Sequence, residues 1–379
     1  MFNSLRFALA RRRRGMKKRE LASRIGVTER SVSSYESGTQ EPEAATMTRI
    51  AQALGFPEEF FFGDDPEIPT PDVASFRSLS KMSAGLRDSA LGAGAIALLL
   101  NEWLESRFDL PPINVPDLGS ERGAQSSVNG VAGPDQTPEV AAEMLRAQWQ
   151  LGEQPIKNLI LLLESKGVRV YSLAIDAKEV DAFSMWSGGR PFMFLNTFKS
   201  AERCRFDAAH ELGHLVMHQH AHPQGPDLER EANAFASAFL MPRASVLASA
   251  PRSITLNSLI KFKRVWAVSV AALNYRLHNL GLSSDWTYRT LCIQIAQEGY
   301  RTSEPQPMPH ERSVVLEKIF AALRTEGLSK SAVAAQLAIP PEEINELTFG
   351  LMLNVLKGQG GDSDVSRPPS PALLRLVKG

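Results

Sequence analysis

The sequence predicts a multidomain, mainly α-helical protein with an all-α bundle at its N-terminus, an α+β domain in its middle and a helical C-terminal region. Three observations lead to this fold class. The chain has 379 residues, more than twice the ~150 of an ordinary domain. Apolar residues recur at helical spacing over most of its length, whereas a central stretch alternates as strands do. Clusters of proline and glycine separate these regions.

These breaks predict a series of segments along the chain. They are an N-terminal helix-turn-helix domain at 1–65, a linker with a long helix and a flexible loop at 66–137, an α+β domain at 138–245, a helical region at 246–303, a small helical domain at 304–356, and a flexible tail at 357–379. The hydrophobic content of 43% and the charged content of 22% are those of a globular protein.

The N-terminal domain has the pattern of a bundle of about five helices. Apolar residues keep helical spacing up to Ile25, and Gly26 permits a tight turn. Thr28 is placed to cap the next helix, in which Val32 and Tyr35 would pack inward. The other side chains of that helix would then face a DNA major groove.

The expected partner of this domain is double-stranded DNA, because the formal net charge of the chain is zero but its first forty residues are basic. The candidate DNA-binding residues are Thr28, Glu29, Arg30, Ser33, Ser34 and Arg19. The basic runs at 11–14 and 17–19 would contact phosphates, or alternatively form only a solvated helix end. Residues 3–63 resemble the Cro/C1-type (XRE) helix-turn-helix family, and we expect a homodimer.

The residue pattern of the middle domain predicts both helices and strands. Helices are expected at 139–149, 156–166, 201–218 and 227–240, and strands at 168–173, 182–186 and 191–196. The last two strands flank the turn Ser187-Gly188-Gly189. The helix at 227–240 should stop before Pro242.

A metal-binding pattern lies in the third of these helices. His210 and His214 are one helical turn apart, so both imidazoles can reach one metal ion at ~2.0 Å. Glu211 would lie beside the open coordination position and take a proton from metal-bound water. The segment His210-Glu211-Leu212-Gly213-His214 therefore predicts metal-assisted hydrolysis, although HExxH also arises by chance in ordinary helices.

A catalytic zinc site needs a third protein ligand, and the next helix offers candidates. We prefer Glu229, which follows His214 by 15 residues (229 − 214 = 15), with Glu231 as the reserve. Asn233 lies one turn beyond Glu229 and would orient the ligands as a polar partner. The expected cofactor is one Zn²⁺ per chain, and Mn²⁺ also suits two histidines and a carboxylate.

Other reactive side chains nearby have simpler interpretations. We expect His218, His220 and His222 to form a solvated helix end and loop, because the helix already supplies two ligands. Cys204 is better explained as a small core residue than as a reactive thiol. No residue that would stabilise an oxyanion stands out.

The segments around the motif resemble the ImmA/IrrE family of metallopeptidases. The resemblance covers about 140–245 and is carried by 201–209 before the motif, and by 229–236 and Leu240-Met241-Pro242 after it. It implies a reduced zincin-like peptidase domain of the gluzincin type.

Matched position by position, the resemblance implies that His210, His214 and Glu229 hold zinc and that Glu211 is the general base. It also implies cleavage of a helix-turn-helix repressor in a stress or signal response. The strand at 191–196 would be the edge that holds an extended substrate.

The rest of the chain is less informative. With the segment 76–80, the two domains together resemble fused XRE–ImmA/IrrE regulators. The segment 260–282 predicts either a winged-helix-like element or plain helical packing, and 328–347 predicts either another helix-turn-helix unit or the same plain packing. These parts would serve dimerisation, substrate docking or gating.

The sequence therefore supports a DNA-binding regulator that cleaves a repressor-type protein, or itself, with zinc. One alternative is a transcription factor that uses the zincin fold as a sensor or interaction module; another is an antitoxin-like or phage-defence-like regulator. The two cysteines, Cys204 and Cys292, form no CxxC, and the longest apolar run, 90–100, is shorter than the ~20 residues that span a bilayer. We expect a cytoplasmic protein without membrane contact.

Overall fold

The computed structural model describes residues 1–70, 75–76, 83–119, 137–173, 182–219, 225–350 and 375–376. Its contacts form two compact units, each assembled from separate stretches of the chain. The first unit comprises Met1–Pro69, Ser83–Pro112 and Ser313–Gly379, and the second Thr70–Met82 and Ile113–Arg312. Most of the expected flexible loop and nearly all of the expected tail lie outside the described residues.

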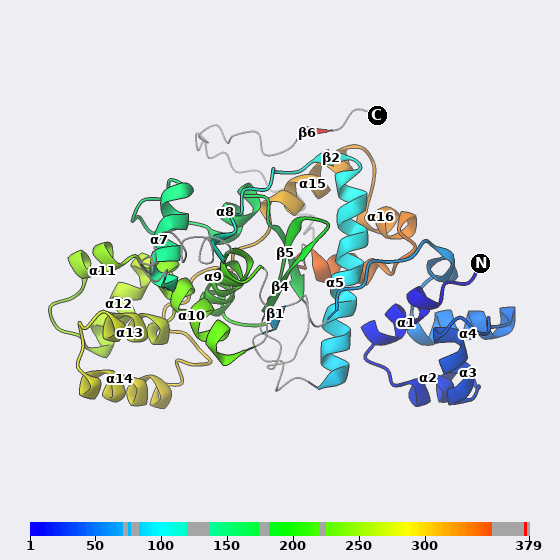
Figure 1. The fold of residues 1–379 in the computed structure, drawn as a ribbon, viewed down its shortest axis with the longest axis horizontal. Helices are drawn as coiled ribbons and strands as arrows, with labels where there is room; N and C mark the ends of the chain where they lie inside the picture. The colour runs from blue at the N-terminus through cyan, green and yellow to red at the C-terminus, as the bar shows by residue number, and fades with distance from the viewer. Residues whose placement is uncertain are drawn as a thin grey trace, which may run out of the picture. The chain divides into compact units, whose positions relative to one another are not determined.

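The first unit begins with the predicted helix-turn-helix bundle (Figure 1). Its elements are α1 (Ser4–Arg13), α2 (Lys18–Ile25), α3 (Glu29–Glu36), α4 (Ala44–Leu54) and the 3-10 helix η1 (Glu58–Phe62). Gly26 ends α2 with a φ of 67°, a left-handed conformation that favours glycine. Thr28 caps α3 by accepting a hydrogen bond from the Ser31 amide at 3.1 Å. The turn and the cap therefore form as the sequence predicts.

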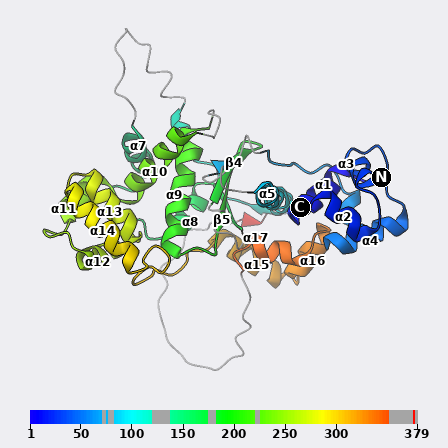
Figure 2. The same ribbon diagram turned by 90° about the horizontal axis from the view of Figure 1, so that it is seen from below.

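In the described part of the first unit, a long helix and three shorter ones follow this bundle. They are α5 (Ala84–Glu105), α15 (Val314–Thr325), α16 (Lys330–Gln336) and α17 (Pro341–Leu347). The helix α5 packs against α1 and α17 (Figure 2). A Cβ at Gly92 of α5 would lie 3.0 Å from Arg13 Cα, so glycine permits this close approach. The short strands β2 (Phe108–Asp109) and β6 (Arg375–Leu376) pair antiparallel.

The second unit contains a mixed sheet in the order β1-β4-β5-β3. The strands are β1 (Ser75–Phe76), β3 (Arg169–Leu173), β4 (Ala182–Ser187) and β5 (Arg190–Asn196). The hairpin β4–β5 is antiparallel, and β3 runs parallel to β5. The expectation that 191–196 forms an edge strand is wrong, because β5 is hydrogen-bonded on both sides.

Four helices build the core on this sheet. They are α7 (Pro138–Gln148), α8 (Leu159–Ser165), α9 (Ala201–Met217) and α10 (Pro226–Leu240). The helices α8 and α9 contact the strands, α10 packs on α9, and α7 packs on α10. Figure 2 shows α9 between the strands β4 and β5 on one side and α10 on the other. The helix α10 stops before Pro242, as predicted. The helix α9 is therefore buried on two sides, which places its HExxH motif in the interior.

The second unit continues as helices α11 (Arg243–Ser249), α12 (Leu256–Trp266), α13 (Val270–Asn279) and α14 (Asp285–Gln297). Ala267 joins α12 to α13 with a φ of 52°, which gives a helix-turn-helix connection. Residues 225–350 are described without a gap and contain no strand. The winged-helix-like expectation for 260–282 is therefore wrong about the wing.

Buried ion pairs hold the chain after α14 against this unit. Lys263 Nζ lies 2.8 Å from Glu202 Oε1 and 3.3 Å from Glu304 Oε1. Arg205 pairs with Glu311, whose other oxygen accepts the Leu159 amide at 2.9 Å and so holds the start of α8. Among the described residues, none of the helices is both long and apolar enough to cross a membrane.

Candidate metal centre and nucleic-acid interface

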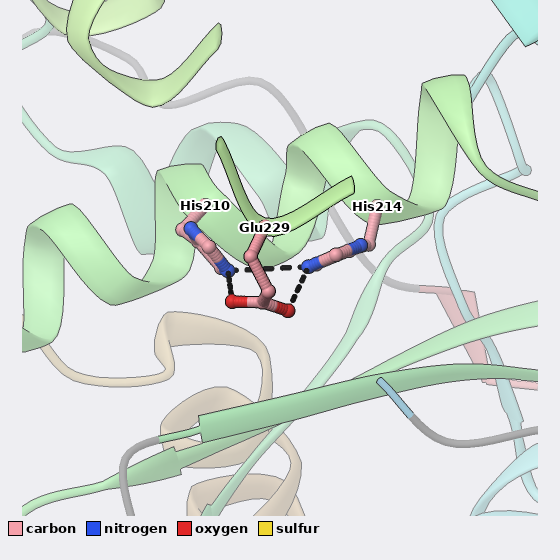
Figure 3. A group of neighbouring side chains, drawn as sticks. All are labelled: His210, His214 and Glu229. Carbon is pink, nitrogen blue, oxygen red and sulfur yellow. Dashed lines mark hydrogen bonds and ion pairs between the residues drawn. The ribbon is translucent and has the colours of Figure 1, made fainter. Parts of the chain in front are cut away.

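The helix α9 presents its two motif histidines inside the protein. Ser200 caps the helix by accepting a hydrogen bond from the Arg203 amide at 3.3 Å. His210 is 1% exposed and His214 is 4% exposed. Because they lie four residues apart, their imidazoles project from the same side of the helix (Figure 3).

The glycine inside the motif lets α10 approach α9 closely. A Cβ at Gly213 would lie 3.1 Å from Phe235 Cδ1 and 3.3 Å from Ala232 Cα. These contacts are tighter than ordinary van der Waals packing. The absence of a side chain at Gly213 therefore helps to bring Glu229, at the start of α10, against the histidines.

Three ligand side chains converge at this point (Figure 3). His214 Nε2 lies 3.1 Å from His210 Nε2 and 3.2 Å from Glu229 Oε1. His210 Nε2 lies 3.4 Å from Glu229 Oε2. A tetrahedral zinc ion with bonds of ~2.0–2.1 Å requires its ligand atoms to be ~3.3 Å apart. His210, His214 and Glu229 therefore match both the donor set and the spacing of a catalytic zinc site, and they form a group able to hold a metal.

The carboxylate of Glu229 is favoured in its ionised form. Burial alone would raise the pKa of Glu229, but hydrogen bonds and charge interactions with His210 and His214 outweigh it and lower the pKa. An ionised carboxylate is the form that coordinates a metal ion. The reserve candidate, Glu231, contacts His218 instead.

Glu211 is held beside the cluster by a residue of the sheet. It is 1% exposed, and its Oε2 accepts a hydrogen bond from Ser184 Oγ of β4 at 2.7 Å. Sequence reasoning missed Ser184, because nothing local marks a serine of a strand as the partner of a glutamate on a helix 27 residues away.

The expectation that His218 belongs to a solvated helix end is wrong. It is 5% exposed, and its Nδ1 lies 3.0 Å from Nδ1 of His214. Its Nε2 lies 3.1 Å from Oε2 of Glu231. The signal was present in the sequence, because His218 follows His214 by the same helical turn that separates His214 from His210. His220 and His222 lie outside the described residues.

Two further candidates have structural contacts. Asn233 Nδ2 donates to the backbone carbonyl oxygen of Glu229 at 2.7 Å, so it holds the helix turn that carries this ligand. The Cys204 thiol lies 3.1 Å from the backbone oxygen of Asn196. Burial, helped by the charge of Asp207, raises the pKa of Cys204 to about 12, which agrees with a packing residue.

The candidate DNA-reading residues lie where the sequence places them. Thr28, Glu29, Arg30 and Arg19 are exposed, and Ser33 and Ser34 are partly exposed. Val32 and Tyr35 of the same helix are buried, at 0% and 5% exposed. The outward face of α3 is therefore available to a major groove.

Most arginines of the run at 11–14 form ion pairs within the protein. The prediction that this run contacts DNA phosphates is therefore wrong for most of its members. Arg11 Nε lies 2.5 Å from Glu36 Oε1, and both side chains are 10% exposed. Arg13 and Arg14 pair with Glu343 at 2.8 and 2.7 Å.

Lys18 also forms an ion pair with Glu36, and its Nζ lies 2.9 Å from Glu36 Oε2. Burial would raise the pKa of Glu36, but the hydrogen bonds from Arg11 and Lys18 outweigh it and lower the pKa. Within the two basic runs, Arg12, Lys17 and Arg19 remain exposed for phosphate contacts.

Comparisons with known proteins match the two regions of the chain that contain these candidate sites. Residues 163–278 match a peptidase family described as the IrrE N-terminal-like domain, and residues 8–61 match the helix-turn-helix family. Each match describes one region of the chain: a helix-turn-helix region of the XRE type and, further along, an IrrE/ImmA-like peptidase-family region. The resemblance stated from the sequence is confirmed.

Two curated relatives match a short part of the chain. They are HTH-type transcriptional regulators of Sinorhizobium medicae (strain WSM419) and Rhizobium meliloti (strain 1021). Each is 36% identical over 61 residues, which is 16% of this chain and 44% of the relative. The chain thus spans less than half the length of these curated relatives. Their similarity covers 61 residues and supports a transcription-regulator domain.

Proposed function

We propose that this chain is a DNA-binding transcription regulator whose second unit is a zinc-dependent endopeptidase. The observation that carries the proposal is the convergence of His210, His214 and Glu229 within 4.8 Å of one another, beside a buried Glu211. Two imidazoles and a carboxylate are a catalytic donor set that leaves a coordination position open. A structural zinc site would normally fill all four positions with protein ligands.

Each residue of this centre has a separate task in the proposed hydrolysis. A bound zinc ion supplies an activated water molecule and polarises the scissile carbonyl. Glu211 takes the proton of the attacking water on its carboxylate and later delivers it to the leaving amine. Ser184 fixes the orientation of that carboxylate through the 2.7 Å hydrogen bond.

The substrate in this proposal is an extended protein segment that takes the place of the two-residue strand β1 and pairs with β4 there. The chain offers a precedent, because β1 pairs antiparallel with β4 and places Ser75 opposite Ser184. Ser184 also contacts Glu211, so a peptide on this edge lies next to the general base. We propose a helix-turn-helix repressor, or the chain itself, as the protein that is cleaved in response to stress or another signal.

The DNA-binding part of the proposal rests on the exposed face of α3 and the exposed basic residues Arg12, Lys17 and Arg19. The chain binds double-stranded DNA as a homodimer in the cytoplasm, so that two copies of α3 read two half-sites. Light scattering during size-exclusion chromatography, with and without DNA, measures this oligomeric state.

The decisive experiment compares wild type with Glu211→Gln and with Glu298→Gln, an exposed control in the same unit. Metal content is measured first, and cleavage is then assayed on helix-turn-helix proteins of the same source and on the chain itself. We expect about one zinc per chain in all three proteins, with cleavage lost only in Glu211→Gln. Cleavage that persists in Glu211→Gln contradicts the general-base assignment.

The same experiment addresses the alternative of a sensor without peptidase activity. Zinc binding with no cleavage by wild type, together with normal regulation by Glu211→Gln, would replace the peptidase by a sensor or interaction module. An antitoxin-like or phage-defence-like role would instead require a partner that binds without being cut.

A further inference from the structure

Three helices of the first unit, α15 to α17, repeat α1 to α3 at a constant offset. Lys330 corresponds to Lys18 (330 − 18 = 312), and α16 and α17 then align with α2 and α3. The helix α2 is followed by Gly26 with a φ of 67°, and α16 by Ala338 with a φ of 52° at the same offset. The preceding turns also match, with Gly15 at 62° and Gly327 at 80°.

Backbone hydrogen bonds repeat at the same offset. The Val27 amide donates to the Ala22 oxygen at 3.0 Å, and the Ile339 amide donates to the Ala334 oxygen at 2.9 Å. Likewise the Gly15 amide donates to the Arg12 backbone oxygen at 2.8 Å, and the Gly327 amide donates to the Arg324 backbone oxygen at 3.0 Å. The two connections in each copy therefore share one backbone geometry.

Side-chain contacts repeat as well. Lys18 Nζ lies 3.3 Å from Ser33 Oγ and 2.9 Å from Glu36, whereas Lys330 Nζ lies 3.3 Å from Asn345 Oδ1 and 2.8 Å from Thr348 Oγ1. The buried positions correspond in four pairs. They are Leu21 and Val333, Ala22 and Ala334, Val32 and Ile344, and Tyr35 and Leu347. Residues 313–350 therefore have the helix-turn-helix fold, which the sequence left open for 328–347.

The second helix of this copy does not have the chemistry of a DNA-reading helix. The helix α17 contains Glu342, Glu343 and Glu346 and no lysine or arginine. Carboxylates in a groove repel DNA phosphates. The one lysine of α16, Lys330, already contacts side chains of its own copy.

Instead, α17 binds the arginine end of α1. Glu343 is 1% exposed, and its two carboxylate oxygens accept hydrogen bonds from Arg13 Nε at 2.8 Å and Arg14 Nη1 at 2.7 Å. Arg13 also pairs with Glu346 and donates to Ser89 Oγ of α5 at 3.2 Å. Every nitrogen of the Arg13 guanidinium thus has a partner in α5 or α17.

We propose that residues 313–350 form a second helix-turn-helix module that binds protein instead of DNA, and that its ligand is the arginine end of α1 in the N-terminal helix-turn-helix domain. The acidic α17 occupies Arg13 and Arg14, as a DNA phosphate would, and holds the two copies together. The DNA-binding domain is therefore one part of a larger unit that the C-terminal module completes. This inference is independent of the proposed peptidase activity.

Hydrogen exchange in the full chain tests the docking. Glu343→Gln leaves Arg13 buried without its full charge partner, so we expect the exchange of amides in α16 and α17 to rise about a hundredfold. Glu342→Gln, on the exposed side of the same helix, is the matched control and should leave exchange unchanged. Equal exchange in the two variants overturns the docking proposal.

A milder variant covers the case in which Glu343→Gln does not fold. Arg14→Gln removes one of the two arginine contacts with Glu343 and keeps the pairs of Arg13. We expect a rise in exchange of about tenfold in α17 and the adjoining part of α1, and a rise at the end of α4, where Arg14 also donates to the Leu54 carbonyl oxygen at 2.7 Å. Exchange at the wild-type rate in this variant also contradicts the proposal.

The salt dependence of binding to a mixed-sequence DNA duplex gives a second readout. Each phosphate contact contributes about 0.9 to the slope of log affinity against log salt. We expect Arg19→Gln to lower that slope by about this amount, and Arg14→Gln to leave it unchanged because Arg14 contacts α17. A decrease in Arg14→Gln equal to that of Arg19→Gln would reassign Arg14 to a phosphate and overturn its docking role.

Discussion

Replacing His218 by phenylalanine should weaken zinc binding, although His218 is not a ligand. A His214 that binds metal through Nε2 must carry its proton on Nδ1. That proton points at Nδ1 of His218, 3.0 Å away, so His218 accepts it and donates from Nε2 to Glu231 at 3.1 Å. The chain of contacts therefore fixes both the tautomer and the orientation of the His214 ring.

The size of the effect follows from what the substitution leaves behind. His214 is 4% exposed, so its Nδ1 proton would lose its partner in a site that water hardly reaches. A buried polar group without a partner costs about 1–3 kcal/mol. Loss of a group that orients a metal ligand typically lowers affinity 10–100-fold, which is about 1.4–2.7 kcal/mol. These two free-energy ranges agree, and we therefore expect the Kd for zinc to rise by about one to two powers of ten.

The assay is competition for zinc between the protein and a chromophoric chelator. His310→Phe removes an exposed histidine of the same unit and serves as the matched control. Circular dichroism establishes that His218→Phe is folded, and Glu231→Gln tests the outer member of the chain if it is not. A Kd for His218→Phe within twofold of both wild type and His310→Phe would refute the orienting role.

Three further perturbations follow from the geometry of the second unit. Ser184→Ala should lower kcat/KM about tenfold without changing zinc affinity, because it removes a hydrogen bond to Glu211 worth about 1.5 kcal/mol. Ser184→Thr should restore activity, whereas a parallel loss of zinc binding in Ser184→Ala would show that Ser184 only supports the fold. Gly213→Val should weaken zinc binding more than Gly213→Ala, because even a Cβ would lie 3.1 Å from Phe235; equal zinc affinities in the two variants would mean that the close approach of α9 and α10 does not set the ligand geometry. In a Cys292→Ser background, Cys204 should react with iodoacetamide at pH 8 at least about a hundredfold more slowly in the native protein than in the unfolded one. The reason is that burial raises the pKa of the Cys204 thiol to about 12. Comparable rates in the two states would contradict its packing role.

Local patterns accounted for the helices of both family-matched domains and for the metal cluster. His210, His214 and Glu229 were predicted from helical spacing and ligand chemistry, and the structure brings their ligand atoms together. The hairpin β4–β5 was predicted from its turn and its alternating residues. The histidine pair and the hairpin turn depend on residues within a few positions of one another, which is the range over which sequence periodicity is informative. Glu229 lies 15 residues beyond His214 and was chosen by its ligand chemistry on the next helix.

The errors concerned contacts between distant segments. The strand β5 was expected at an edge, but β3 and β4 pair with its two sides, and alternation along one strand contains no information about its neighbours. The arginines of α1 were expected to face phosphates. Whether such a side chain meets a phosphate or a carboxylate is decided by Glu36 and Glu343, which come from other helices.

The sequence by itself determined which chemistry this protein carries: a histidine pair with its glutamates on two successive helices, and a capped turn before a DNA-reading helix. These are properties of short segments, and helical geometry converts their spacing directly into position. Only the tertiary structure decided how that chemistry is supported. Ser184 reaches Glu211 from the sheet, and residues 313–350 fold onto the unit that begins at residue 1. Such contacts depend on which surfaces pack together, and no local period in the sequence specifies that choice.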